Sequence, residues 1–348
     1  MRPFKSICVI KFSMAFTRYL LILFLFTLIS CNPCSESDDS GDSIEKVFFS
    51  AKSSNSESNL IFEFDGVFNF INPISENAEL YSGPDKSYLV FLSRSENGDD
   101  TLKTYSLENS EINSVLVSFD LFQVMEPKMI YGKEEIVFHN GQGQVFISDL
   151  NGNLQQISAD LLLNSSPVVS KNGNRIAFFE NNSNPLLSIR DHAGNVIFNI
   201  DLQSEPITNP TINLDLTAFV GHSNDKQEIF VYSDNNLLIQ QELINLNIND
   251  LVVINSQHLL LISSEGDLWT LNNGTEFKRS LDLENSSRIV FVDYNEESQK
   301  IIYGVNNSLR NSTELYVSDV EINDQGIQIL NSDLISNKIS KAFWLINE

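Results

Sequence analysis

Apolar residues come in short runs along most of the chain, and polar residues that form turns separate these runs. From Lys46 onward the runs alternate or are briefly continuous, and clusters of Asn, Asp, Gly and Ser lie between them. Such runs are typical of β-strands, and no segment keeps the 3.6-residue period of an amphipathic helix. The pattern therefore predicts an all-β fold over residues 46–348.

One segment, Ser166–Asp201, shows the arrangement most clearly. Two turns with a central glycine, Lys171–Asn174 and His192–Asn195, separate apolar runs within it. Asn and Gly tolerate the positive φ that tight turns need. We therefore expect four strands in this unit, at Ser166–Ser170, Arg175–Phe179, Leu187–Asp191 and Val196–Ile200.

The unit recurs along the chain. The members of one second-strand position are separated by 42, 47, 40, 41, 42 and 42 residues, and they are Phe49, Phe91, Phe138, Phe178, Phe219, Leu261 and Tyr303. Prolines recur in the first strand, at Pro127, Pro167 and Pro210. A period near 42 with four strand-like runs is what a propeller blade requires. Third-strand aromatics, which we expect in the core between blades, recur at Phe146, Phe230, Trp269 and Tyr316.

The unit resembles the WD40-like repeat of TolB-type β-propellers. Pro167, Gly173 and the Ile176-Ala177-Phe178 run fall where that repeat has Pro, Gly and Ile-Ala-Phe, although Lys171-Asn172 stands where it prefers Pro-Asp. The resemblance implies a closed ring of blades, each of four antiparallel strands. The chain would enter at a second strand, Lys46–Ser50, and Ile339–Leu345 would supply the missing first strand. We therefore predict seven blades, one of them built from both chain ends, with six or eight as alternatives.

The segment before residue 46 has a different character. Tyr19–Ser30 is an apolar run behind Lys11 and Arg18, which is right for the hydrophobic part of a signal peptide and short for a membrane span. Its end resembles the lipobox of bacterial lipoproteins, with Leu28, Ile29 and Ser30 before Cys31. The resemblance implies cleavage after residue 30, acylation of Cys31 and anchoring in the outer membrane through the acyl chains. We expect residues 31–45 to form a flexible acidic tether; an ordinary secretory signal is the alternative.

Charge and cysteine content restrict the partners of the mature chain. The sequence has 22 basic and 46 acidic residues, and Arg2, Lys5, Lys11 and Arg18 all precede Cys31. So acidic a chain repels phosphate backbones and anionic head groups, so we expect no nucleic acid partner. With Cys31 acylated, Cys34 would be the one free thiol, which excludes a disulfide framework.

We find no catalytic motif in the sequence and predict no enzyme, cofactor or bound metal. Four histidines are present, at His139, His192, His222 and His258, and none shares a short ligand spacing with another. A His/Asp metal site on the propeller axis is the alternative. Propellers usually bind ligands at rim loops or in the axial funnel, so we take as candidate binding residues Glu96, Asp99, Asp100, Asn181, His222 and Asp225.

These expectations combine into one functional hypothesis. The protein is predicted to be a lipid-anchored, non-enzymatic interaction module of the cell envelope, exposed at the cell surface, with an envelope or extracellular protein as partner. A glycan is the alternative partner and the periplasmic side the alternative location. The competing functional hypotheses are a polysaccharide-binding or polysaccharide-cleaving propeller and a TolB-like component of envelope assembly.

Overall fold

We describe the protein from a computed structural model. The described residues are 46–344, apart from 53–58, 66, 72–76, 95–99, 118–122, 159, 163–164, 224–225, 282, 284–286, 311 and 324–325. They belong to one compact unit, Ile44–Glu348. The predicted leader, Cys31 and the tether lie outside the described residues. Within the described part of the chain, no helix is long and apolar enough to cross a membrane.

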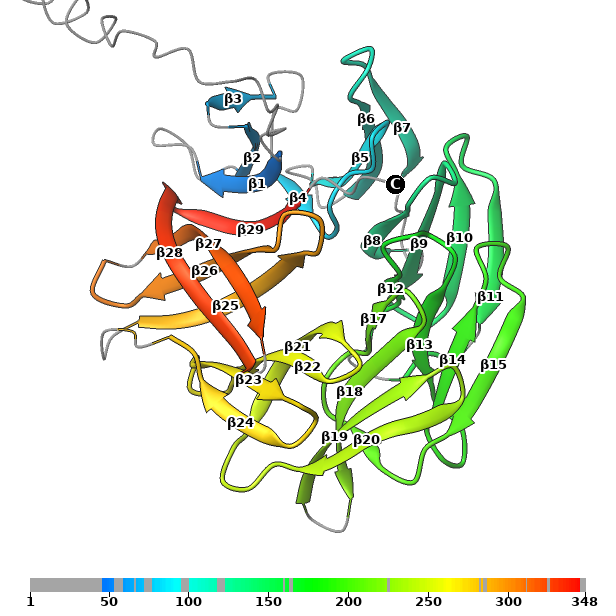
Figure 1. The fold of residues 1–348 in the computed structure, drawn as a ribbon. Coiled ribbons are helices and arrows are strands. Elements are labelled where there is room, and N and C mark those ends of the chain that lie inside the picture. The colour runs from blue at the N-terminus through cyan, green and yellow to red at the C-terminus, as the bar shows by residue number, and fades with distance from the viewer. Residues whose placement is uncertain are drawn as a thin grey trace, which may run out of the picture. The chain divides into compact units, whose positions relative to one another are not determined.

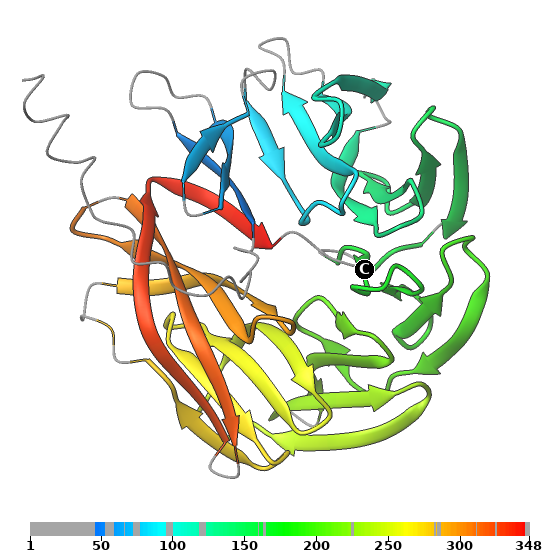
Figure 2. The same ribbon diagram turned by 45° about the horizontal axis from the view of Figure 1, so that its top comes forward.

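The strands form seven antiparallel sheets, arranged as the blades of a ring (Figures 1 and 2). From the innermost strand outward, blade 1 contains β29 (Ile339–Trp344), β1 (Val47–Lys52), β2 (Asn59–Phe64) and β3 (Phe68–Phe70). Blade 2 contains β4 (Ala78–Leu80), β5 (Tyr88–Arg94), β6 (Asp100–Ser106) and β7 (Ile112–Val117); blade 3 contains β8 (Val124–Ile130), β9 (Glu135–Asn140), β10 (Val145–Asp149) and β11 (Leu154–Ser158). Blade 4 contains β12 (Val168–Val169), β13 (Ile176–Glu180), β14 (Leu186–Arg190) and β15 (Val196–Asp201).

The remaining blades follow the same order with small variations. Blade 5 contains β16 (Glu205–Pro206), β17 (Thr211–Asn213), β18 (Leu216–Ser223), β19 (Lys226–Ser233) and β20 (Asn236–Glu242), and its first strand is split because β16 and β17 both pair with β18. Blade 6 contains β21 (Ile248–Asn255), β22 (His258–Ser263), β23 (Leu268–Asn272) and β24 (Glu276–Arg279). Blade 7 contains β25 (Ser287–Asn295), β26 (Lys300–Asn307), β27 (Ser312–Asn323) and β28 (Gly326–Asn337).

The ring closes as the sequence predicted, through a blade shared by both ends of the described chain. β29 pairs antiparallel with β1, and Val47 lies opposite Trp344. Trp344 is 2% exposed and packs in a cluster with Phe49 of blade 1 and Leu315 of blade 7. Because the closed ring gives every blade a neighbour on each side, the inner strands of each blade are covered on both faces. The prediction of seven blades of four antiparallel strands is confirmed.

The hydrophobic core lies between blades. Among the described residues, seven buried clusters each join two neighbouring blades. In blade 1, Phe49 packs toward blade 7 while its neighbour Phe48 packs toward Leu89 of blade 2. Successive side chains on a strand point to opposite faces, so a strand buried on both faces needs a continuous apolar run. The recurring second-strand position supplies one buried side chain to each junction, at Phe49, Phe91, Phe138, Phe178, Phe219, Leu261 and Tyr303.

The third-strand aromatics pack against these residues, as expected of core positions. Phe219 stacks on Phe230 with ring centroids 5.1 Å apart, and Tyr303 stacks on Tyr316 at 5.5 Å. Each pair lies directly opposite in the strand register. Offset stacking of this kind adds about 1 kcal/mol to the free energy gained by burial.

Turn chemistry sets the register of the blade that the sequence showed most clearly. Gly173 has φ 64° and Gly194 has φ 81°, so both adopt the backbone conformation expected from their turns. A Cβ on Gly173 would lie 1.9 Å from the carbonyl oxygen of Tyr131 in blade 3. This turn therefore also lets blade 4 approach its neighbour closely.

Candidate functional site

Three of the six rim residues predicted as binding candidates lie within the described chain. Asp100 begins β6, is 5% exposed and lies 3.9 Å from the guanidinium of Arg94. Asn181 follows β13 and is exposed, and His222 is an exposed residue of β18. Among the described residues no hydrogen bond or ion pair joins these three to one another. Glu96, Asp99 and Asp225 lie outside the described residues, and the proposed rim site stays a prediction.

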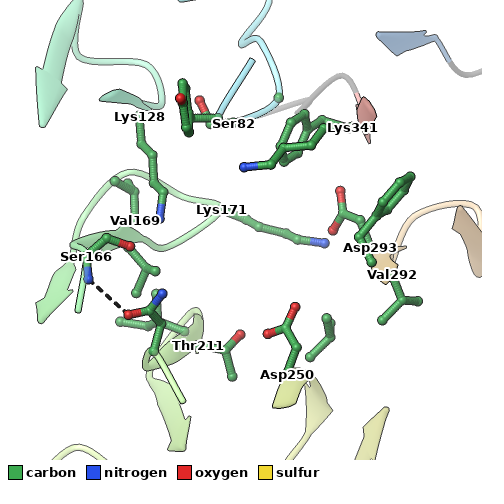
Figure 3. Close-up of a pocket in the computed structure, with 18 of the residues that line it drawn as sticks. Ser82, Lys128, Ser166, Val169, Lys171, Thr211, Asp250, Val292, Asp293 and Lys341 are labelled. Carbon is green, nitrogen blue, oxygen red and sulfur yellow. Dashed lines mark hydrogen bonds between the residues drawn. The ribbon is translucent and has the colours of Figure 1, made fainter. Parts of the chain in front are cut away.

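A cavity lies on the propeller axis within the described part of the chain. It has a volume of about 430 Å³, and all seven blades contribute residues to its wall from, or next to, their innermost strands. Ligand pockets in proteins usually have volumes of 300–1,000 Å³. Figure 3 shows polar and charged side chains from several blades pointing into this space, which we call the axial channel.

Hydrogen bonds between neighbouring blades fix the wall of the axial channel. Met129 N donates to Ser82 Oγ at 3.1 Å between blades 2 and 3. Ser166 N donates to Asn209 Oδ1 at 2.9 Å between blades 4 and 5 (Figure 3). Asn213 Nδ2 donates to Ile254 O at 3.1 Å between blades 5 and 6. A wall held by such contacts presents its side chains in a fixed arrangement.

Three lysines project into the axial channel from different blades. Lys128 of β8 donates a hydrogen bond from Nζ to the carbonyl oxygen of Pro167 at 2.7 Å. Lys341 of β29 places its Nζ 4.6 Å from the centre of the Tyr81 ring, which is favourable cation–π geometry. An ammonium group has three donors, so Lys128 keeps donors available to a ligand.

The third lysine spans the channel. Lys171 lies in the turn after β12 of blade 4, and its Nζ donates to the carbonyl oxygen of Tyr294 in blade 7. Blades 4 and 7 stand on opposite sides of a seven-membered ring. The side chain therefore crosses the axis, as Figure 3 shows, and narrows the channel at this level.

Three carboxylates share the same space. Asp293 accepts from Tyr294 N at 2.9 Å through Oδ1 and from Trp344 N at 3.4 Å through Oδ2, so it joins blade 7 to the closing strand. Asp250 of β21 accepts from Leu251 N at 2.9 Å through Oδ1. Glu126 of β8 completes the set. The charged lining thus consists of three lysines and three acids, in a chain with 22 basic and 46 acidic residues.

A local distortion places Glu126. The β8–β9 register shifts between Met125 and Lys128, and Glu126 has φ 45°, in the left-handed region. A β-bulge bends the strand and redirects a side chain, and a non-glycine residue in this region costs of order 1 kcal/mol or more. The bulge directs both Glu126 and Lys128 at the cavity.

Burial and mutual charge change the ionisation of these groups. Burial lowers the pKa of Lys128 to about 8, although Glu126 and Asp250 favour its charged form. Burial raises the pKa of Asp250 against the opposing effects of the Leu251 amide, Lys128 and Lys341. Burial is the largest single effect and would raise the pKa of Glu126, but Lys128, Ser166 and Lys341 together outweigh it, so the pKa is lowered. The groups therefore interact electrostatically across the channel.

The histidines do not gather on the axis. His139 contacts its neighbouring backbone, with Nδ1 at 3.2 Å from Asn140 O, and burial lowers its pKa. His192 lies 3.2 Å from a carboxylate oxygen of Glu135, between blades 4 and 3. His258 Nδ1 lies 3.0 Å from Asn255 Oδ1 within the same turn. Within the described part of the chain, no group of three or more His, Cys, Asp or Glu side chains could hold a metal ion.

Sequence reasoning missed the charged lining of the channel. Each member lies within or beside a first strand, as Glu126 and Lys128 do on either side of Pro127, and it belongs to no local motif. A repeat alignment that flagged charged residues at first-strand positions would have drawn attention to Lys128, Asp250 and Lys341.

Comparisons with known proteins support the fold. The chain is similar to a quinonprotein alcohol dehydrogenase-like protein from Bacteroides thetaiotaomicron, with a TM-score of 0.57 and 11% identity over 87% of this chain and 78% of that one. It is similar to the β-propeller domain of the Trilobed protease from Pyrococcus furiosus, with a TM-score of 0.54 and 13% identity over 82% and 94%. For TolB from Acinetobacter baumannii the TM-score is 0.51 and the identity 12%, over 88% and 68%. No family model and no curated protein sequence matches the chain.

Proposed function

We propose that this protein is a lipid-anchored binding protein of the bacterial cell envelope that takes up its ligand in the axial channel, without catalysing a reaction. The axial channel carries the proposal. It is a cavity of about 430 Å³ into which three lysines and three carboxylates project from a hydrogen-bonded wall. A concave site with a few convergent polar groups is the usual form of a ligand-binding site.

The anchoring part of the proposal rests on the sequence. The apolar run Tyr19–Ser30 and the Leu28-Ile29-Ser30-Cys31 sequence are what a lipoprotein leader requires, and the acidic segment that follows would separate the propeller from the membrane. The rim loops, which we predicted from the sequence as a binding site, would be available to an envelope or extracellular protein partner.

Metabolic labelling tests the anchor. Cells expressing the full chain are grown with an alkyne-bearing fatty acid, and the purified protein is assayed for label. We expect Cys31→Ser to abolish labelling and to move the protein from the membrane to the soluble fraction. Cys34→Ser, three residues away, is the matched control and should keep both properties. Equal labelling of the Cys31→Ser variant and the wild type would refute acylation at this residue.

Protease treatment of intact cells tests the location. An anchored propeller at the cell surface should be cleaved in whole cells, whereas one facing the periplasm should resist until the cells are lysed. Cross-linking in the same cells would then identify any large partner at the rim. Recovery of the protein in the cytoplasmic fraction would contradict the envelope assignment.

A further inference from the structure

We propose that the axial channel binds a small zwitterion that carries both an ammonium and a carboxylate group, as a free amino acid or a short peptide does. This inference deepens the proposed function, because it names the ligand class of the same site. Its support lies in how the charges of the channel are arranged and in what they cost the fold.

The charged groups of the channel are not neutralised by contact with one another. Lys128 and Lys341 act electrostatically on both Glu126 and Asp250. Nevertheless, among the described residues none of these four forms an ion pair with an N···O distance within 4 Å. Two ammonium groups and two carboxylates therefore face a shared cavity, where each sign still has interaction capacity.

Maintaining these groups costs stability. The pKa of Lys128 shows that burial disfavours its charge, and Glu126 adopts a strained backbone conformation at a bulge. Asn213 lines the same cavity, and its Oδ1 is buried without a hydrogen-bond partner among the described residues. Asn213 is 7% exposed, and an unpaired buried acceptor destabilises the fold. A bound ligand that pairs with the channel charges would offset the part of these costs that the charges cause.

The mixture of signs decides between ligand classes. A phosphate or another anion would be attracted by Lys128 and Lys341 but would also meet the carboxylates of Glu126 and Asp250. A polyamine or a metal ion would meet the converse repulsion. A zwitterion places one charge against each sign, so it recovers both attractions and avoids both repulsions. The channel thus selects by charge pattern, and the neutral middle of the ligand would lie against aliphatic wall residues such as Val169 and Val292.

A set of four tripeptides tests the charge requirement on the unaltered full chain, purified in detergent. The probes are trialanine, which is zwitterionic at pH 7; acetylated trialanine, an anion; trialanine amide, a cation; and the doubly capped peptide, which is neutral. Isothermal titration calorimetry gives each affinity. We expect trialanine to bind at least tenfold more tightly than either singly charged form, and the neutral form to bind most weakly.

Two variants then assign each charge to a residue. Lys128→Met should remove the preference for a free carboxylate over an amide, and Asp250→Asn should remove the preference for a free amine over an acetyl group. Lys226→Met and Asp201→Asn change charges on outer strands, and these matched controls should leave all four affinities as in the wild type.

The outcomes separate this inference from the proposed function. Equal affinity for the zwitterion and a singly charged form, unchanged preferences in both channel variants, or no binding of trialanine at millimolar concentration would each overturn the zwitterion site. None of these results bears on acylation of Cys31, which the labelling experiment decides. Conversely, an unlabelled protein that still discriminates among the four peptides would keep the channel inference and refute only the anchor.

Discussion

Closure of the ring can be tested at Trp344, the last residue of β29. Its side chain is 2% exposed, packs between blades 1 and 7, and donates from Nε1 to Asp293 O at 3.4 Å. Replacing a buried Trp by Ala typically costs 3–5 kcal/mol, because burial free energy is lost and a cavity remains. We therefore expect Trp344→Ala to lower the free energy of unfolding by about 4 kcal/mol.

Urea unfolding measures this loss directly. The chain has two tryptophans, so in the variant Trp269 of blade 6 alone reports the transition by fluorescence. With a urea m-value of about 3 kcal/mol/M, the midpoint should fall by roughly 1 M. Trp344→Phe keeps an aromatic ring in the site, so its urea midpoint should lie between those of Trp344→Ala and the wild type.

An exposed residue provides the control for the Trp344 experiment. Leu309 is 82% exposed, so Leu309→Ala should change stability by less than about 0.5 kcal/mol. If Trp344→Ala cost no more than this control, the C-terminal strand would not be holding the ring closed, and the reasoning would be refuted.

Three further predictions follow from single contacts. The Nε1 of Trp269 is buried without a hydrogen-bond partner among the described residues, so Trp269→Phe should be neutral or stabilise the fold by up to about 1 kcal/mol in urea unfolding; a loss like that of Trp344→Phe would contradict this. A Cβ on Gly83 would lie 2.2 Å from the carbonyl oxygen of Trp344, whereas one on Gly141 would meet nothing within 4 Å. Gly83→Ala should therefore lower the free energy of unfolding by about 1–3 kcal/mol, and Gly141→Ala should leave it almost unchanged. Equal melting temperatures for the two variants would refute the close approach. Lys128 has a pKa of about 8 in the folded state against 10.5 for an ordinary lysine, so the unfolded chain binds more protons than the folded one between these pH values. The free energy of unfolding should therefore rise by up to about 3 kcal/mol because of this residue as the pH rises from 8 to 10.5. This rise should be missing from the stability–pH profile of Lys128→Met, and superimposable profiles of variant and wild type would disprove the burial effect.

The blade repeat could be predicted because its strands and turns are recognisable from residues that are adjacent in the sequence. Each second strand is an apolar run next to turn residues, and in blade 4 the predicted strands agree with β13, β14 and β15 to within a residue or so. Closure could be predicted for the same reason, since the first blade repeat begins at its second strand and Ile339–Leu345 supplies a first strand. These features depend on short-range periodicity and on simple counting of strands.

Other features depend on contacts that no local pattern records. The split first strand of blade 5 arises because β16 and β17 pair with different parts of β18. Both β27 and β28 run for 12 residues because they pair with each other well beyond the usual length of a blade strand. The channel is the extreme case, since Lys128 and Lys341 are far apart in sequence and face the same cavity only in the closed ring.

Closure and the channel are therefore one structural event. β29 completes blade 1, and the same strand carries Lys341 into the cavity. Asp293, on the opposite side of the junction, lines the cavity while accepting a hydrogen bond from Trp344 N. Until β29 pairs with β1, the channel lacks one of its three positive charges and part of its wall. Glu126 and Lys128 lie on one strand, β8, whereas Lys341 joins them only in the closed ring. Any ligand that needs both signs would therefore stabilise that closed state over an open one.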